Sequence, residues 1–258
     1  MASVVTSFKE SVSKPEFSLH KFLKKNKGAI LQLEKKVDEK QKKAMLRSEN
    51  IESFMPLIES AIPEKRKVHF FVNYGGVEYL DNFIATTVKK WELQGKTRAE
   101  KKKITPSFPP FFVVIANGEM HWTTHIFIGL GRRQIPLWWG MNSLSGLWSQ
   151  VTKYFEKMMD ETAKNNEIRL EKFEHQDDSH SCGYFSILYA LLFAIFWRSN
   201  ETQKSAQALF KFVDKHVKEL KNDDLLDVFN SLVRVVAHEN PSPMAQFISS
   251  QLGHDNPT

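Results

Sequence analysis

Residues 171–198, EKFEHQDDSHSCGYFSILYALLFAIFWR, contain the only cysteine of the 258-residue sequence. A polar, turn-forming run over residues 175–181 ends at Cys182, and a strongly apolar segment follows it directly. This pattern predicts that Cys182 lies at the start of a buried helix. Unpaired backbone N–H groups and the positive end of the helix dipole stabilise a thiolate at such a position. The stretch therefore predicts a reactive cysteine, provided that another part of the chain supplies a base.

The composition is typical of a globular protein with one large domain, or with one domain and an appendage. Hydrophobic residues make up 41% of the sequence, and the formal net charge of +6 is spread along the chain. This charge pattern does not predict nucleic-acid binding. A single cysteine cannot form an intramolecular disulfide.

The sequence is expected to contain neither a transmembrane segment nor a signal peptide. The longest apolar run, residues 183–197, is about 15 residues long, which is too short to span a bilayer. Residues 1–18 lack the basic-then-apolar order of a signal peptide. We therefore expect a soluble, intracellular protein without a transmembrane segment.

Residues 1–66 are predicted to form an N-terminal tail and a helical appendage. Residues 1–17 show no periodic pattern and are expected to be a loose tail. An amphipathic helix is expected from Ser18, a suitable N-cap, to about residue 47. A second helix is expected over residues 49–62, with a kink at Pro56 and an end at Pro63. These helices would either contact a substrate, a partner protein or a membrane, or only stabilise the rest of the chain as an appendage.

Residues 67–258 are predicted to form a second, α+β unit. Apolar and aromatic runs separated by glycine-containing turns predict a small, mostly antiparallel central sheet. Its strands are expected near residues 68–76, 111–116, 120–130, 134–141 and 168–173. Apolar residues at helical spacing predict flanking helices at residues 77–93, 145–164, 205–220, 223–236 and 244–252, besides the helix that begins at Cys182.

Nine histidines are available as a base for Cys182. His121 and His125 lie on one predicted strand, whereas His175 and His180 lie in the polar run beside the thiol. The spacing of His121 and His125 resembles a zinc-binding pair, but the glutamate of that motif is absent. Strand positions four residues apart are also separated by roughly 13 Å. No metal site is therefore expected.

Four motifs, in this order, resemble those of the SUMO-protease and adenovirus-protease superfamily of cysteine peptidases, clan CE. They are His121-Trp122 at the start of a strand, Asn142-Ser143-Leu144 at the end of the next, Gln176 six residues before Cys182, and Cys182-Gly183 opening an apolar helix. The resemblance covers about residues 70–200 of the chain. It implies a circularly permuted, papain-like cysteine protease fold.

The resemblance also implies a role for each of these residues. Cys182 would be the nucleophile, and His121 would take the thiol proton and later return it to the leaving amine. Asn142 would orient the His121 ring, at a position where this superfamily commonly has aspartate. Gln176 would direct its amide N–H at the developing oxyanion. No cofactor is implied.

The expected substrate is the C-terminal tail of ubiquitin or a ubiquitin-like protein. In this superfamily, the tryptophan at the position of Trp122 forms one wall of a narrow tunnel that accepts a diglycine tail. The other wall usually comes from an N-terminal Trp-Leu-x-Asp element, for which residues 77–83 are a loose counterpart. Tyr74 and Trp139 are further candidate substrate-binding residues. Of the neighbours Trp138 and Trp139, one is expected in the core and the other at the cleft.

The leading interpretation is therefore a deubiquitinase or ubiquitin-like protein-specific protease. The lysine-rich chain with its helical N-terminal part suggests a bacterial effector secreted into a host cytosol. Three alternatives remain: an effector acetyltransferase of the same superfamily that uses acetyl-CoA, a viral maturation protease, and an interaction module without enzymatic activity. Glutamate is typical of the acetyltransferases at the position of Asn142.

Overall fold

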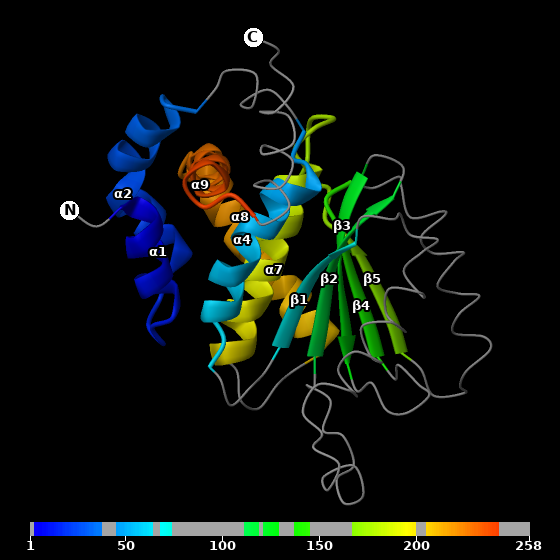
Figure 1. The fold of residues 1–258 in the computed structure, drawn as a ribbon. Helices are drawn as coiled ribbons and strands as arrows, with labels where there is room; N and C mark the ends of the chain where they lie inside the picture. Colours follow the sequence, from blue (N-terminus) through cyan, green and yellow to red (C-terminus); the bar gives the residue numbers. More distant parts are fainter. Residues whose placement is uncertain are drawn as a thin grey trace, which may run out of the picture.

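The computed structural model describes residues 3–37, 45–63, 68–73, 111–118, 121–128, 137–144, 167–199 and 205–242. In these residues, five strands form one sheet and the helices lie on one side of it (Figure 1). The strands are β1 (Val68–Asn73), β2 (Phe111–Gly118), β3 (His121–Ile128), β4 (Leu137–Asn142) and β5 (Glu167–Lys172), and their order in the sheet follows the chain. This architecture confirms the predicted α+β class.

The sheet is mixed. The pairs β2–β3 and β3–β4 are antiparallel, as the sequence predicts for residues 111–142, whereas β1–β2 and β4–β5 are parallel. The two parallel pairings make the sheet less antiparallel than expected. Because β5 runs parallel to β4, the ends of both strands lie at the same edge of the sheet, where β3 begins.

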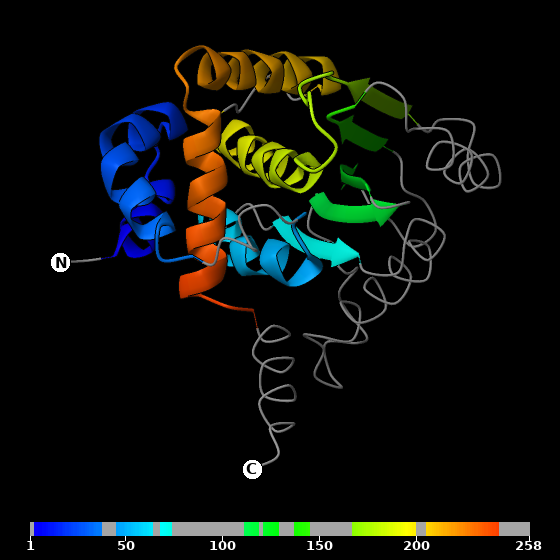
Figure 2. The same cartoon turned by 90° about the horizontal axis from the view of Figure 1, so that it is seen from above.

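Helix α7 (Cys182–Ser199) is the central helix of the fold. It packs against β2, β3 and β4 on one side and against α4 (Ser48–Ser60) and α8 (Ala206–Asn222) on the other. Figure 2 shows α7 enclosed between these elements. Its side chains are buried all around the helix from residue 182 to residue 198, as expected for a helix that is apolar on every face. The start of α7 is therefore held firmly at the sheet.

The N-terminal residues fold into a helix that the sequence analysis did not predict. Helix α1 (Val4–Val12) begins at Ser3, whose side chain accepts a hydrogen bond from the backbone N–H of Thr6. Val4, Phe8 and Val12 lie on its buried face. The predicted loose tail over residues 1–17 is therefore wrong, because apolar residues spaced four apart suffice to bury this helix against its neighbours.

Helix α2 (Leu19–Glu34) begins at the predicted cap, Ser18, but ends well before residue 47. Helix α4 begins at Ser48 and continues through Pro56. The helices α1, α2 and α4 contribute to the same hydrophobic core as α7 and α9 (Leu226–Glu239). The predicted domain boundary after residue 66 stays a prediction.

Two arginines connect the N-terminal helices to both ends of α7. Arg198, near the end of α7, donates hydrogen bonds to the carbonyl oxygens of Val12, the last residue of α1, and of Ala61, the residue after α4. Arg234 of α9 donates from Nε to Glu34 Oε1 at 2.7 Å and from Nη1 to the hydroxyl of Tyr184 at 3.0 Å. The first turn of α7 is thereby joined to α9 and α2.

Several predicted features fall outside the described residues. They are the helices expected over residues 77–93, 145–164 and 244–252, and the candidate substrate-binding residue Tyr74. Among the helices that the structure does describe, none combines the length and the apolar character needed to cross a bilayer.

Candidate active site

Three strand ends and the start of α7 meet at one edge of the sheet. His121 begins β3 and Asn142 ends the antiparallel strand β4 beside it. Strand β5 ends next to Asn142 and leads into a loop that contains Gln176. Cys182 is the first residue of α7, and its thiol accepts a hydrogen bond from the backbone N–H of Trp122. The topology therefore gathers the predicted site residues from four separate segments.

The hydrogen bonds of Asn142 define the state of the His121 ring. The side-chain oxygen Oδ1 of Asn142 lies 2.7 Å from His121 Nε2 and also accepts the backbone N–H of Leu144 at 2.9 Å. A backbone N–H can only donate, so the atom facing both groups must be the amide oxygen. His121 Nε2 therefore carries the proton, and Nδ1 is left unprotonated. The ring is in the tautomer that can accept a proton at Nδ1.

The environment of the site favours the neutral forms of both reactive groups. Burial lowers the pKa of His121, and the hydrogen bond with Asn142 opposes this only in part. Burial also raises the pKa of Cys182, although the backbone N–H groups of Trp122, Gly183 and Cys182 itself act in the opposite direction. Both shifts favour a neutral thiol and a neutral imidazole as the resting forms.

A carboxylate in the preceding loop adds to the rise of the Cys182 pKa. Asp178 accepts hydrogen bonds from the backbone N–H groups of His180 and Ser181, each at 2.7 Å, and from the hydroxyl of Ser181 at 2.6 Å. Burial alone would raise the pKa of Asp178, but these hydrogen bonds hold it below its usual value. The ionised carboxylate shapes the turn into α7 and at the same time disfavours a thiolate at Cys182.

Gln176 is buried and held by both ends of its side-chain amide. Its oxygen Oε1 accepts the hydroxyl of Ser143 at 2.7 Å, and its nitrogen Nε2 donates to the carbonyl oxygen of Asp178 at 2.6 Å. An amide nitrogen carries two N–H groups, so these bonds use only one of them. The second N–H is the donor that the sequence analysis assigns to the oxyanion, and that role stays a prediction.

The residues opposite Trp122 come from a segment that the sequence analysis did not select. The indole N–H of Trp122 donates to the carbonyl oxygen of Leu46 at 3.0 Å. A Cβ atom at Gly183 would lie 2.9 Å from Leu46 Cβ and 3.4 Å from Trp122 Cδ1. The 45–47 segment, which precedes α4, therefore lies directly on Trp122 and on the first turn of α7. This close approach requires the glycine at position 183.

An open cavity of about 600 Å³ lies along this contact. Its lining residues are Met45, Leu46, Arg47, Ser48, Glu49, Asn117 and Trp122. Residues 77–83, the predicted counterpart of the second tunnel wall, fall outside the described residues, and that assignment stays a prediction. The sequence carries little signal for the 45–47 segment, because Met45 and Leu46 form only a short apolar pair before Arg47.

The paired tryptophans of β4 are both buried. Trp138 is 1% exposed and stacks on Phe127, with ring centroids 6.2 Å apart. Trp139 is 3% exposed and belongs to the hydrophobic core that includes α7. The expected division between core and cleft is therefore not seen, and a substrate-binding role of Trp139 stays a prediction.

The ring of His125 is held by other side chains. His125 is fully buried, and its ring nitrogens lie 2.8 Å from the hydroxyl of Thr123 and 3.2 Å from the indole nitrogen of Trp138. Within the ranges that the structure describes, no three His, Cys, Asp or Glu side chains are grouped closely enough to hold a metal ion.

No protein-family model matches the sequence, and no curated protein matches it. Among solved structures, a de-sumoylating protease is similar with 15% identity and a TM-score of 0.42, over 82% of this chain and 85% of that chain. The SUMO protease Ulp1, with its catalytic cysteine oxidised to a sulfenic acid, is similar with 18% identity and a TM-score of 0.37. The match covers 70% of this chain and 79% of that chain. AvrA delL154 with IP6 and CoA is similar with 13% identity and a TM-score of 0.40. The match covers 90% of this chain and 89% of that chain.

The structural matches are thus to SUMO proteases and to AvrA. The SUMO proteases are the class that the sequence motifs resemble. At identities of 13–18%, this likeness is one of fold.

Proposed function

We propose that this protein is a cysteine peptidase that hydrolyses the bond after the C-terminal glycine of ubiquitin or a ubiquitin-like protein. The observation that carries the proposal is the state of His121. Its Nε2–H points to Asn142 at 2.7 Å, which leaves Nδ1 to accept a proton, and the backbone N–H of the next residue, Trp122, reaches the thiol of Cys182. A buried thiol at the start of a helix, beside such a base, is suited to nucleophilic catalysis.

The first half of the proposed reaction forms an acyl-enzyme. As the substrate carbonyl approaches, the thiol proton passes to His121 Nδ1 and the sulfur of Cys182 attacks the carbonyl carbon. Asn142 Oδ1 keeps the resulting imidazolium in place. The tetrahedral intermediate then breaks its C–N bond, and the amine leaves with the proton from His121. A thioester between Cys182 and the terminal glycine remains.

The second half hydrolyses this thioester. A water molecule gives a proton to His121 Nδ1 and attacks the thioester carbonyl, and Cys182 leaves and regains a proton. In both halves, negative charge develops on the carbonyl oxygen. The backbone N–H groups at the start of α7 and the second amide N–H of Gln176 are the donors that we assign to this oxyanion. A single donor of this kind contributes about 100-fold to 1,000-fold in rate.

The resemblance of Trp122 to the tunnel tryptophan of the SUMO-protease superfamily supports a substrate tail without side chains, and Trp122 lies in a closely packed place. Leu46 and Trp122 approach the first turn of α7 so closely that a Cβ atom at position 183 would overlap Leu46. An extended diglycine tail needs less space than any other dipeptide. We therefore propose that selection of the tail is steric, and that the N-terminal helices contact the folded part of the substrate or another partner.

Activity-based probes test this proposal directly. Ubiquitin, SUMO, NEDD8 and ISG-type modifiers that carry a C-terminal electrophile are incubated with the wild type and with Cys182→Ala. We expect at least one modifier to label the wild type and none to label the variant. Cys182 is the only cysteine, so the mass of the adduct identifies the site. Failure of every modifier would refute the substrate assignment, and a stable acetyl group on Cys182 after incubation with labelled acetyl-CoA would favour acetyl transfer.

The cellular setting is part of the same proposal. The lysine-rich composition and the helical N-terminal part support an effector that acts in a host cytosol. A translocation reporter fused to the full chain tests this, and the proposal fails if the reporter stays in the producing cell.

A further inference from the structure

The loop between β5 and α7 has an unusual backbone that is held at two points. Phe173 N–H donates to the carbonyl oxygen of Asn142 at 2.9 Å, and Gln176 N–H donates to that of Ser143 at 3.1 Å. Between them, Glu174 has a φ of 54°. This left-handed conformation favours glycine, so a glutamate adopts it only where its surroundings impose it.

The side chain of His175 in this loop is held by a ring contact and two hydrogen bonds. Its ring is 4% exposed and lies parallel to the ring of Phe173, with centroids 4.8 Å apart and an angle of 4° between the planes. Nε2 lies 3.1 Å from Asp214 Oδ1, and Nδ1 lies 3.0 Å from the hydroxyl of Tyr189. Since a carboxylate only accepts, Nε2 carries the proton and Nδ1 accepts from Tyr189.

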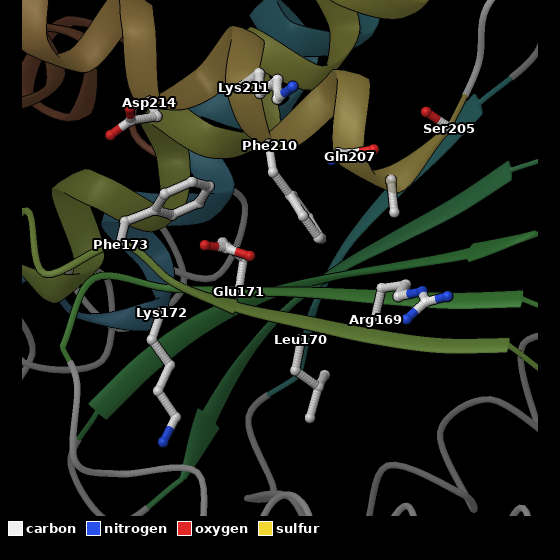
Figure 3. A pocket seen from close by; sticks show the side chains of 11 residues that line it. Arg169, Leu170, Glu171, Lys172, Phe173, Ser205, Gln207, Phe210, Lys211 and Asp214 are labelled. Atoms are coloured by element: carbon white, nitrogen blue, oxygen red, sulfur yellow. The ribbon is translucent and has the colours of Figure 1, made fainter.

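The partner of His175 is itself fixed. Asp214 of α8 also accepts from Lys218 at 2.8 Å through Oδ2. Burial raises the pKa of Asp214, but the hydrogen bonds from Lys218 and His175 hold it below its usual value. Figure 3 shows Asp214 and Phe173 on the wall of a cavity of about 860 Å³ between β5 and α8. His175 is therefore held by residues of α8 and α7 and by Phe173, which follows β5. None of these contacts involves the residues that bind the Gln176 side chain.

We propose that His175 is a positioning residue for the oxyanion donor Gln176. The two residues are adjacent, so the backbone angles that His175 imposes decide where the amide of Gln176 is directed. Ser143 and Asp178 hold the amide itself, but they act only once the backbone has placed it between them. The inference rests on the proposed function, because only acyl transfer creates an oxyanion at Cys182.

The single cysteine allows a test that needs no knowledge of the natural substrate. Acylation of Cys182 by p-nitrophenyl acetate passes through a tetrahedral oxyanion, whereas alkylation by iodoacetamide does not. In His175→Gln, we expect the acylation rate to fall about 10-fold to 100-fold, with the alkylation rate unchanged within about twofold. Tyr189→Phe removes one hydroxyl and keeps the packing, so it provides a milder variant with the same expected direction if His175→Gln folds poorly.

His216→Gln is the matched control, because His216 lies two residues from Asp214 on α8 and its Nδ1 faces the carbonyl oxygen of Phe212 in its own helix. We expect it to leave both rates unchanged. A parallel fall of acylation and alkylation in His175→Gln and Tyr189→Phe would show a general structural role and overturn the proposal.

A double-mutant cycle tests whether His175 affects the acylation rate through Gln176. Gln176→Ala should lower acylation, and adding His175→Gln to it should cause no further loss, because the donor that His175 positions is already absent. Additive losses would overturn the proposal. These outcomes are independent of the modifier probes. A chain that no modifier labels, but in which His175→Gln lowers acylation alone, would refute the substrate assignment and retain the role of His175.

Discussion

The carbonyl oxygen of Leu46 accepts the indole N–H of Trp122 at 3.0 Å, across 76 residues of sequence. This bond brings the segment before α4 onto the first turn of α7, where Cys182 is 1% exposed. The side chain of Leu46 packs against Gly183, the residue after Cys182, so we expect it to limit access to the thiol.

Shortening Leu46 should open the site. In Leu46→Ala, we expect Cys182 to react several-fold faster with iodoacetamide, and modifier probes with alanine before the terminal glycine to be accepted. Leu57→Ala is the matched control, since Leu57 is a buried leucine of α4. Both variants should lose about 2–5 kcal/mol in unfolding free energy, as is usual for buried leucines. Equal alkylation rates in the two variants would show that Leu46 does not cover the thiol.

Gly183→Ala should disrupt the same contact from the other side. The added Cβ would lie 2.9 Å from Leu46 Cβ, so we expect a loss of about 1–3 kcal/mol in unfolding free energy from overpacking and a loss of probe labelling. Combining it with Leu46→Ala should recover part of the stability. Gly28→Ala is the contrasting control, because no atom lies within 4 Å of its Cβ position in α2. There we expect a gain of about 0.5–1 kcal/mol.

Replacement of Asn142 tests how His121 is oriented. Asn142→Asp keeps an oxygen for His121 and for the N–H of Leu144, and its negative charge should raise the pKa of His121. The acid limb of the pH–rate profile for labelling should therefore move to higher pH, and alkylation of Cys182 near pH 7 should become faster. Asn142→Ala removes the oxygen and should slow labelling at every pH. An unchanged acid limb in Asn142→Asp would contradict the assignment of His121 as the base.

Buried histidines predict a loss of stability in acid. Burial lowers the pKa of His125 from 6.5 to about 3. A lowered pKa contributes stability above pH 6.5 that is lost as the pH falls towards 3, since the unfolded chain binds the proton first. Between about pH 7.5 and pH 4.5, this amounts to about 2–3 kcal/mol for one histidine.

Urea unfolding at the two pH values measures the effect. His125→Gln should lower stability at pH 7.5 but lose less on acidification than the wild type. His238→Gln, an exposed histidine near the end of α9, should behave like the wild type. If His125→Gln lost as much as the wild type on acidification, another group would be responsible for the acid sensitivity.

Local patterns in the sequence predicted most elements and the core of the site. Alternating apolar and aromatic residues located all five strands, and the polar run before Cys182 located the start of α7. His121 and Asn142 were paired through motif order, and the structure places them 2.7 Å apart. These features depend on short stretches of sequence and on the geometry of neighbouring strands.

Contacts between distant segments could not be predicted in the same way. The contact of Leu46 with Trp122 and the clamp of Asp214 on His175 join segments 76 and 39 residues apart. The parallel pairings of β1 and β5 likewise depend on connections that local patterns do not encode. Helix α1 was missed because its serine, threonine and lysine residues obscure an apolar face that only tertiary packing makes stable.

The hydrogen bonds of Arg198 limit how the N-terminal helices can be studied. A chain that began after Pro63 would lack the carbonyl oxygens of Val12 and Ala61, and a buried cation at the end of α7 would lose two acceptors. Loss of such partners usually costs more than loss of packing alone. Truncation would therefore disturb the helix that presents Cys182, and substitutions on the exposed faces of α1 and α2 are the informative way to map a docking role.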